Sequence, residues 1–118
     1  MAYDRRTGEF VRELLQDLGE LRIRPMFGGA GVYLDDLFFG IVVDEALYLR
    51  ADDDTREAFV AAGSRQFTYE MKDGQIASMA YWSLPDAAAD DPDEAVRWAR
   101  LAVEAAAKKV AAKKKPKR

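Results

Sequence analysis

Cysteine and histidine are both absent from this 118-residue chain, and their absence excludes several classes of chemistry. Without cysteine there is no disulfide framework and no thiolate nucleophile, and without either residue there is no zinc site of the Cys/His type. An imidazole general base is excluded as well, together with every Ser–His or Cys–His catalytic arrangement. Carboxylates, lysines and tyrosines are therefore the acid and base groups that remain.

Long hydrophobic runs are also absent. No stretch approaches the roughly 18 apolar residues that a membrane-spanning helix needs, and the first residues, MAYDRRTGEF, lack the apolar core of a secretory signal. We therefore expect no membrane contact and a cytoplasmic location, with a bacterial cytoplasm as the default. With 49% hydrophobic and 11% aromatic residues, the chain has enough apolar surface for one domain with a real core.

The net charge of −3 combines two segments of opposite sign. Residues 1–107 hold all 21 acidic residues and 11 of the 18 basic ones, for a net charge of −10, whereas residues 108–118 carry +7. We predict a single domain over 1–107, followed by a Lys-rich tail over 108–118 that continues the last helix and frays.

The tail allows two interpretations. Clustered cations bind nucleic acid without sequence choice by releasing counterions, and the candidate contacts are Lys108, Lys109, Lys113, Lys114, Lys115, Lys117 and Arg118. Alternatively, these side chains form the solvated end of a helix, where cations complement the helix dipole. No aromatic residue lies within 108–118 to stack on a base, so any binding to DNA through the tail would be nonspecific.

Apolar spacing and capping residues predict three helices. The first is expected over 5–18, with Asp4 as its N-cap and Gly19 ending it in the left-handed conformation. The second opens at Asp54, in a capping box with Glu57, and ends at Gly63. The third begins at 91–94, where an Asp N-cap, a proline and a Glu follow one another, and its alanine-rich stripe runs into the lysines.

Between the helices, the hydrophobic period changes to two. Strands are expected near 22–27, 32–34, 37–43 and 46–51, separated by the pairs Asp35-Asp36 and Asp44-Glu45. The run at 37–43 is apolar on both faces, which is typical of a central strand covered by a helix on at least one side. A second hairpin is expected to turn at Asp73-Gly74 as type I′ and to return over 75–83. The predicted fold class is α+β: helix, three- to four-strand antiparallel meander, helix, β-hairpin and long C-terminal helix.

No segment carries a convincing catalytic, cofactor or metal pattern. The glycines of FGGAG are followed by a strand instead of the helix N-terminus that a phosphate loop needs, so a bulge or a close backbone approach is favoured. The run 52–54 is Asp-Asp-Asp without the spacing of a calcium loop, and helix capping accounts for it. We therefore predict no catalytic residues, no cofactor and no metal. The tyrosines Tyr33, Tyr48, Tyr69 and Tyr81 alternate with aliphatic residues and are interpreted as core or sheet-face residues.

Four ordered segments carry a resemblance to a known family. The sequence RPMFGGAGVYL at 24–34 resembles the RxMFGGxGLY segment of the N-terminal domain of TfoX/Sxy competence regulators. Three more segments follow in the same order, before the Asp91-Pro92 helix start. They are LYLRAD at 47–52, AGS at 62–64 leading to FTYE at 67–70, and MAYW at 79–82 followed by Leu84-Pro85. The resemblance implies a small α+β fold similar to type III secretion chaperones.

The family resemblance also implies a function. Its competence regulators are thought to be transcriptional co-activators that work with a cyclic-AMP receptor protein, and they usually carry a second, helical domain where this sequence has its lysine tail. No catalytic residue is attributed to the family. Within the motif, the candidate partner-docking residues are Met26, Phe27, Gly28, Gly29, Gly31 and Tyr33. The alternative places Met26 or Phe27 in the core and makes the glycines a bend.

The sequence therefore favours a non-enzymatic regulatory or interaction module, which binds a protein partner such as a transcription factor and is able to self-associate. A DNA-associated protein that binds through its lysine tail is the alternative hypothesis. A small enzyme that uses carboxylates is a third, with Glu70 as the acidic residue that capping and turns explain least.

Overall fold

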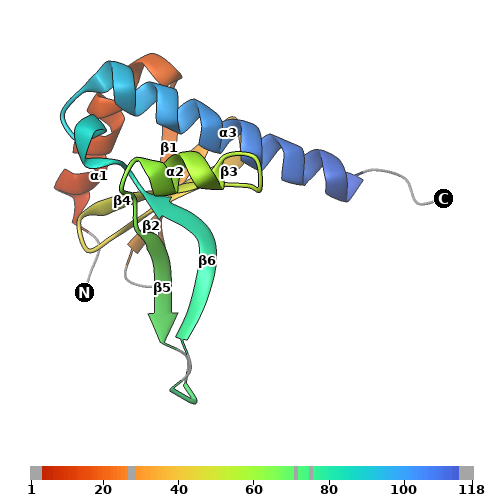
Figure 1. The fold of residues 1–118 in the computed structure, drawn as a ribbon. Coiled ribbons are helices and arrows are strands. Elements are labelled where there is room, and N and C mark those ends of the chain that lie inside the picture. The colour runs from red at the N-terminus through yellow and green to blue at the C-terminus, as the bar shows by residue number, and fades with distance from the viewer. Residues whose placement is uncertain (1–3, 27–28, 71, 75, 115–118) are drawn as a thin grey trace.

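The computed structural model describes residues 4–26, 29–70, 72–74 and 76–114, and gives only the backbone of Met26, Glu70, 76–79 and 113–114. It confirms the α+β class: one antiparallel sheet of six strands with three α-helices, of which the C-terminal one is the longest (Figure 1). None of the described helices is long and apolar enough to cross a membrane.

The sheet joins the predicted meander and the predicted hairpin into one surface. Its strands are β1 (Leu21–Met26), β2 (Gly29–Leu34), β3 (Leu37–Val43), β4 (Ala46–Arg50), β5 (Gln66–Glu70) and β6 (Ile76–Ser83). They lie in the order β1-β2-β3-β4-β6-β5, and each neighbouring pair is antiparallel. The prediction of four meander strands is confirmed, with Pro25 in the edge strand β1, where a missing N–H is tolerated.

The two acidic pairs form tight hairpin turns, as their positions predict. Asp35 and Asp36 have φ of 50° and 68°, and Asp44 and Glu45 have φ of 51° and 64°. Two consecutive residues with positive φ are the signature of a type I′ turn, whose twist matches that of the flanking strands. Aspartate tolerates this conformation because its short side chain bonds to the local backbone.

The first predicted helix is shorter than its apolar spacing suggests. Helix α1 spans Arg5–Leu14, and a separate 3₁₀ turn, η1, covers Gln16–Leu18. Tightening of the last turn is common where a helix ends. Gly19 has φ +144° and ψ −174°, so the prediction of a left-handed cap was wrong, although this extended conformation also favours glycine. The Asp4 cap is confirmed, since its side chain accepts from the backbone N–H of Arg6.

Two further boundaries differ from the predictions. Helix α2 covers Arg56–Ala61 with Thr55, not Asp54, at the N-cap position. The register pairs Glu70 with Ile76, so the connection is not the predicted two-residue turn at Asp73-Gly74, which would pair Glu70 with Ala77. A longer connection needs positive φ at fewer positions, and Gly74 has φ +85°.

Helix α3 spans Pro92–Lys114 and follows the 3₁₀ turn η2 (Asp86–Ala88). Its predicted start is confirmed: Asp91 Oδ1 accepts from the backbone N–H of Glu94 at 3.3 Å. Small residues line its buried side, namely Ala95, Val96, Ala99, Ala102, Ala105 and Ala106. The helix therefore lies close to the sheet, and its C-terminal end extends beyond the strands (Figure 1).

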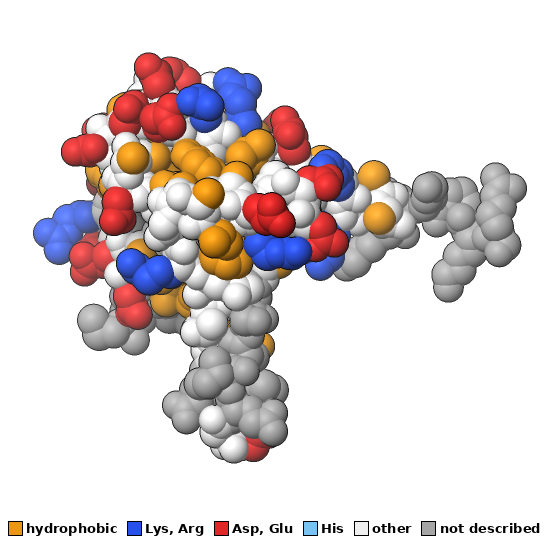
Figure 2. Space-filling view, in the orientation of Figure 1, with side chains coloured by type: hydrophobic (Ala, Val, Ile, Leu, Met, Phe, Trp, Pro, Cys, Tyr) orange, Lys and Arg blue, Asp and Glu red, His pale blue; other side chains and the backbone are white. Residues whose placement is uncertain are grey.

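The core lies between the sheet and the helices. Phe39 and Leu49 from the sheet, Leu15 next to α1 and Phe59 from α2 are fully buried there. Phe59 packs on Trp98 of α3 with ring centroids 4.7 Å apart. All three helices thus contribute to one core on one face of the sheet. On the side of the molecule that carries α2 and α3, acidic and basic side chains are interspersed (Figure 2).

Candidate interaction surface

The face of the sheet that points away from this core has its own set of side chains. Directly paired residues on neighbouring strands share a face, so the pairs Arg22–Tyr33, Gly31–Ile41, Ile41–Tyr48 and Arg50–Tyr81 define the face across five strands. We call this surface the aromatic face. Its members are Arg22, Arg24, Gly31, Tyr33, Phe38, Ile41, Val43, Ala46, Tyr48, Arg50, Phe67, Tyr69, Tyr81 and Ser83. None of them belongs to the core cluster that the described helices cover.

The rings of the aromatic face form two connected groups. In the first, the centroids of Tyr33 and Phe38 are 5.0 Å apart in a stacked arrangement, and those of Phe38 and Tyr81 are 5.8 Å apart. The side chains of Tyr33 and Phe38 are only partly buried. Tyr81 is only 2% exposed and lies beneath them, so the accessible part of this group consists of the Tyr33 and Phe38 rings, which the described helices leave open.

The second aromatic group crosses onto β5. The rings of Tyr48 and Phe67 meet edge to face at 5.1 Å, and Phe67 lies 6.3 Å from Tyr69. Tyr69 is 46% exposed. This group extends the apolar surface of the aromatic face to the β5 edge of the sheet.

Arg50 fixes the centre of the aromatic face. Its guanidinium donates to the hydroxyl oxygen of Tyr81 at 3.2 Å and lies over the Tyr81 ring, 5.5 Å from the centroid. Burial raises the pKa of Tyr81, and the neighbouring Arg50 opposes that rise only in part. Tyr81 is therefore a neutral phenol at physiological pH and serves as a rigid, positioned group.

The residues of the family motif lie at one side of this face. Gly31 and Tyr33 belong to β2 and to the aromatic face, whereas Phe27 and Gly28 lie outside the described residues. Met26 ends β1 and pairs with Gly29. A Cβ on Gly29 would lie inside 3.0 Å of the Val42 carbonyl oxygen, so close packing against β3 explains this glycine without a ligand.

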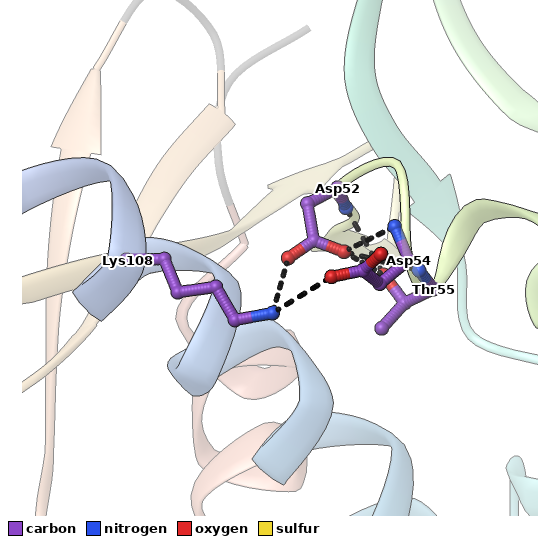
Figure 3. A network of polar contacts seen from close by, with 4 residues as sticks. All are labelled: Asp52, Asp54, Thr55 and Lys108. Atoms are coloured by element: carbon purple, nitrogen blue, oxygen red, sulfur yellow. Dashed lines mark hydrogen bonds and ion pairs between the residues drawn. The ribbon is translucent and has the colours of Figure 1, made fainter. Parts of the chain in front are cut away.

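One lysine of the predicted tail is already paired within the domain. Lys108 Nζ lies 3.2 Å from Asp52 Oδ2 and 3.3 Å from Asp54 Oδ2 (Figure 3). Asp52 also accepts from the backbone N–H groups of Asp54 and Thr55 and from the Thr55 hydroxyl. The network joins the end of α3 to the start of α2. Among the other candidate cations, Lys109, Lys113 and Lys114 lie on α3, and 115–118 fall outside the described residues.

The protonation of this network follows from its contacts. Partial burial raises the pKa of Asp52, but the hydrogen bonds from Lys108 and Thr55 outweigh it, and the net pKa is lowered. The same hydrogen bonds, from Asp52 first and Asp54 second, raise the pKa of Lys108. The charge of Lys108 is therefore held by the two carboxylates, which makes it the least available of the described lysines for DNA.

We expect Asp52→Ala to lower the free energy of unfolding by about 1 kcal/mol at neutral pH, the usual cost of losing a capping carboxylate. Because the pKa of Asp52 is lower in the folded protein, its contribution is full above the ordinary value of 3.8 and is lost as the pH falls through the folded value. Urea unfolding at several pH values measures this. The control is Asp53→Ala, whose side chain is 93% exposed. Equal losses in both variants, or a loss that persists in acid, would contradict the assignment.

The structure brings together residues that the sequence analysis left apart. Tyr33, Tyr48, Tyr69 and Tyr81 all lie on the aromatic face, in agreement with their interpretation as sheet-face residues. Phe38 and Arg50 were not singled out, although period-two alternation along their strands could have placed them on the side of the tyrosines. In the described part of the chain, no group of three or more acidic residues is arranged to hold a metal ion.

A six-stranded antiparallel sheet, with its described helices on one side and an aromatic face on the other, defines a small α+β domain with an open sheet face. The chain matches the model of the TfoX N-terminal domain over residues 13–106 and belongs to that family. The resemblance carried by the sequence motifs is thereby confirmed.

Two curated relatives share this similarity. The chain is 31% identical over 72 residues to the DNA transformation protein TfoX1 of Aliivibrio fischeri (strain ATCC 700601 / ES114). This matched region covers 61% of the present chain and 34% of TfoX1. It is 29% identical over 97 residues to Protein Sxy of Escherichia coli (strain K12). This second matched region covers 82% of the present chain and 46% of Protein Sxy. The matched region thus spans between a third and a half of each relative.

Proposed function

We propose that this protein is a non-enzymatic regulatory module of the cytoplasm, a transcriptional co-regulator that acts by binding a protein partner through its aromatic face. The observation that carries the proposal is the aromatic face itself: five rings that are at least partly exposed, and three arginines, on a sheet surface that no described helix covers. Tyrosine and arginine are among the residues that supply most of the binding energy where proteins meet.

The family supports the regulatory part of the proposal. Both relatives are similar to this chain over part of their length, and one is named a DNA transformation protein. A regulator needs a stable surface and no reacting groups, and the carboxylates of Asp52 and Asp54 are engaged by Lys108 in an ion-pair network within the domain. The aromatic face is the described surface best suited to such binding.

The proposal predicts that a charge on the aromatic face abolishes regulation. Tyr33→Glu places a carboxylate on the partly buried ring group and should remove any change in transcript levels that the wild-type protein produces in cells lacking their own copy. Phe10→Glu is the matched control, because Phe10 is 52% exposed on α1, on the helix side. RNA sequencing at equal protein levels measures both variants. Regulation retained by Tyr33→Glu, or lost equally in both variants, would refute the proposal.

Nonspecific DNA binding is a second candidate function, favoured by the lysines at the end of α3. Lys109, Lys113 and Lys114 belong to the last turns of α3, and the C-terminal end of this helix extends beyond the strands (Figure 1). Cations in such a position attract phosphates through counterion release.

The tail hypothesis is tested with a shortened chain, 1–112, which keeps Lys108 on its two aspartates. If the tail binds DNA, full-length protein should bind a labelled duplex more weakly as salt rises, and 1–112 should lose most of this binding. Fluorescence anisotropy at two salt concentrations measures the difference. Equal binding by both chains, or no binding by the full chain at low salt, would exclude the tail as a DNA contact.

A further inference from the structure

The aromatic face carries charge of one sign only. Its three ionisable side chains apart from tyrosine are Arg22, Arg24 and Arg50, and none of its members is acidic. This contrasts with residues 1–107 as a whole, which carry a net charge of −10. Acidic residues lie at one end of β1: Glu20 comes directly before the strand, and Asp36 in the turn after β2 approaches Arg22 to 3.7 Å in an exposed pair. A partner on this face therefore meets apolar rings with positive charges beside them.

A second copy of this chain does not complement such a surface. If two aromatic faces met, the arginines of one copy would find rings and further arginines on the other, and the Asp36 carboxylate at the edge is already paired with Arg22 of its own copy. Burying an unpaired guanidinium is costly, because its lost hydration is not replaced. Charge complementarity thus requires an occupant that supplies its own carboxylates.

The geometry of the rings argues against nucleic acid on this face. Tyr33 and Phe38 are stacked on each other with 24° between their planes, so each ring already uses one of its two faces on its neighbour. The rings of Tyr48 and Phe67 likewise contact each other, edge to face. A base stacks on a ring whose face is free, so rings that already contact one another are poorly arranged to hold bases.

We infer that the aromatic face binds a protein segment that presents apolar side chains flanked by carboxylates. The apolar side chains would cover the rings between β2 and β5, and the carboxylates would pair with Arg22 and Arg24 at the β1 edge. Both arginines are exposed, and Arg24 has no ion pair with any described residue. The inference rests on the proposed function, to which it adds the chemistry of the partner.

Selection from a random peptide library tests this inference without knowledge of the partner. Phage-displayed dodecapeptides are selected on the full chain, and each enriched peptide is then measured against variants by fluorescence anisotropy. Enriched peptides should combine apolar residues with an excess of Asp and Glu. Arg22→Glu/Arg24→Glu should weaken their binding by at least about tenfold. The control is Arg5→Glu/Arg100→Glu, which makes the same change in net charge at exposed positions on the helix side and should leave binding unchanged.

The outcomes separate the inference from the proposed function. Peptides that lose binding in Tyr33→Glu but carry no acidic excess overturn the inference and leave the proposed function standing. If no enriched peptide depends on Tyr33, both are contradicted. Two further results also overturn the inference: oligothymidine binding that Arg22→Glu/Arg24→Glu abolishes would indicate nucleic acid, and a dimer in sedimentation that Tyr33→Glu dissociates would indicate a second copy. Circular dichroism confirms that each variant is folded.

Discussion

Phe39→Ala is expected to lower the free energy of unfolding by about 3–5 kcal/mol, the usual cost of truncating a buried phenylalanine. The side chain of Phe39 is fully buried in the core that the helices form with the sheet. Its loss leaves a cavity that rigid neighbours, including Leu49 of β4, are unable to fill. A domain of this size is stabilised by about 5–15 kcal/mol in total, so urea unfolding should show a large decrease in the midpoint.

The adjacent Phe38 provides the comparison. It lies on the aromatic face, in contact with Tyr33 and Tyr81, and is only partly buried. Phe38→Ala should therefore cost only about 1 kcal/mol in stability while weakening any ligand of the aromatic face. The two neighbouring substitutions should thus separate stability from binding. If Phe38→Ala destabilised the protein as much as Phe39→Ala, the aromatic face would be part of the core, and its assignment as a binding surface would be wrong.

Gly29→Ala is expected to destabilise the protein by about 2–3 kcal/mol, the cost of forcing extra atoms into a closely packed site. The new Cβ would meet the Val42 carbonyl oxygen and the side chain of Val43. Both residues belong to β3, which pairs with β2 across this point, so the backbones of two strands would have to separate. Thermal unfolding followed by circular dichroism measures the loss.

Gly74→Ala is the matched control for this substitution. Gly74 has φ +85°, and no atom of the described residues lies within 4 Å of the position that a Cβ would occupy there. Alanine at this position should therefore cost only the strain of the conformation, about 1 kcal/mol. A loss at Gly29 that is no larger than the loss at Gly74 would show that the close approach to β3 is not what requires this glycine.

Local chemistry was enough to predict several elements of the fold. The start of α3 follows from an Asp, a proline and a Glu in consecutive capping positions, and each acts locally, so no knowledge of the rest of the chain is needed. The acidic pairs Asp35-Asp36 and Asp44-Glu45 likewise set their own turns. The four strands of the meander follow because short turns force neighbouring strands to pair.

The joining of the two β-segments could not be predicted in the same way. Strands β4 and β6 are separated by α2 and β5 in the sequence, and their pairing, Arg50 with Tyr81, depends on how the chain folds as a whole. The turn between β5 and β6 likewise depends on the register of those two strands. At the start of α2 the spacing pointed to Asp54, whereas the carboxylate that accepts from the backbone N–H groups there is that of Asp52, two residues earlier.

The candidate site, too, was predictable in its local features but not in those that depend on the whole fold. Alternation in the sequence places Tyr33, Tyr48, Tyr69 and Tyr81 on strand faces, but it does not say which face the helices cover. The covering is decided by α1, α2 and α3 together, through residues such as Leu15, Phe59 and Ala99. The aromatic face can therefore be recognised as one surface only when the positions of the helices are known.

Site-specific photo-crosslinking tests the central claim most directly. A photoreactive phenylalanine analogue is incorporated at Tyr69, on the aromatic face, and separately at Phe10, on the helix side; both side chains are exposed, at 46% and 52%. After irradiation in living cells, we predict a defined protein adduct from position 69, lost when Tyr33→Glu is added, and no equivalent adduct from position 10. A protein adduct from position 10 alone, or identical adducts from both positions, would contradict the assignment of the aromatic face as the binding surface.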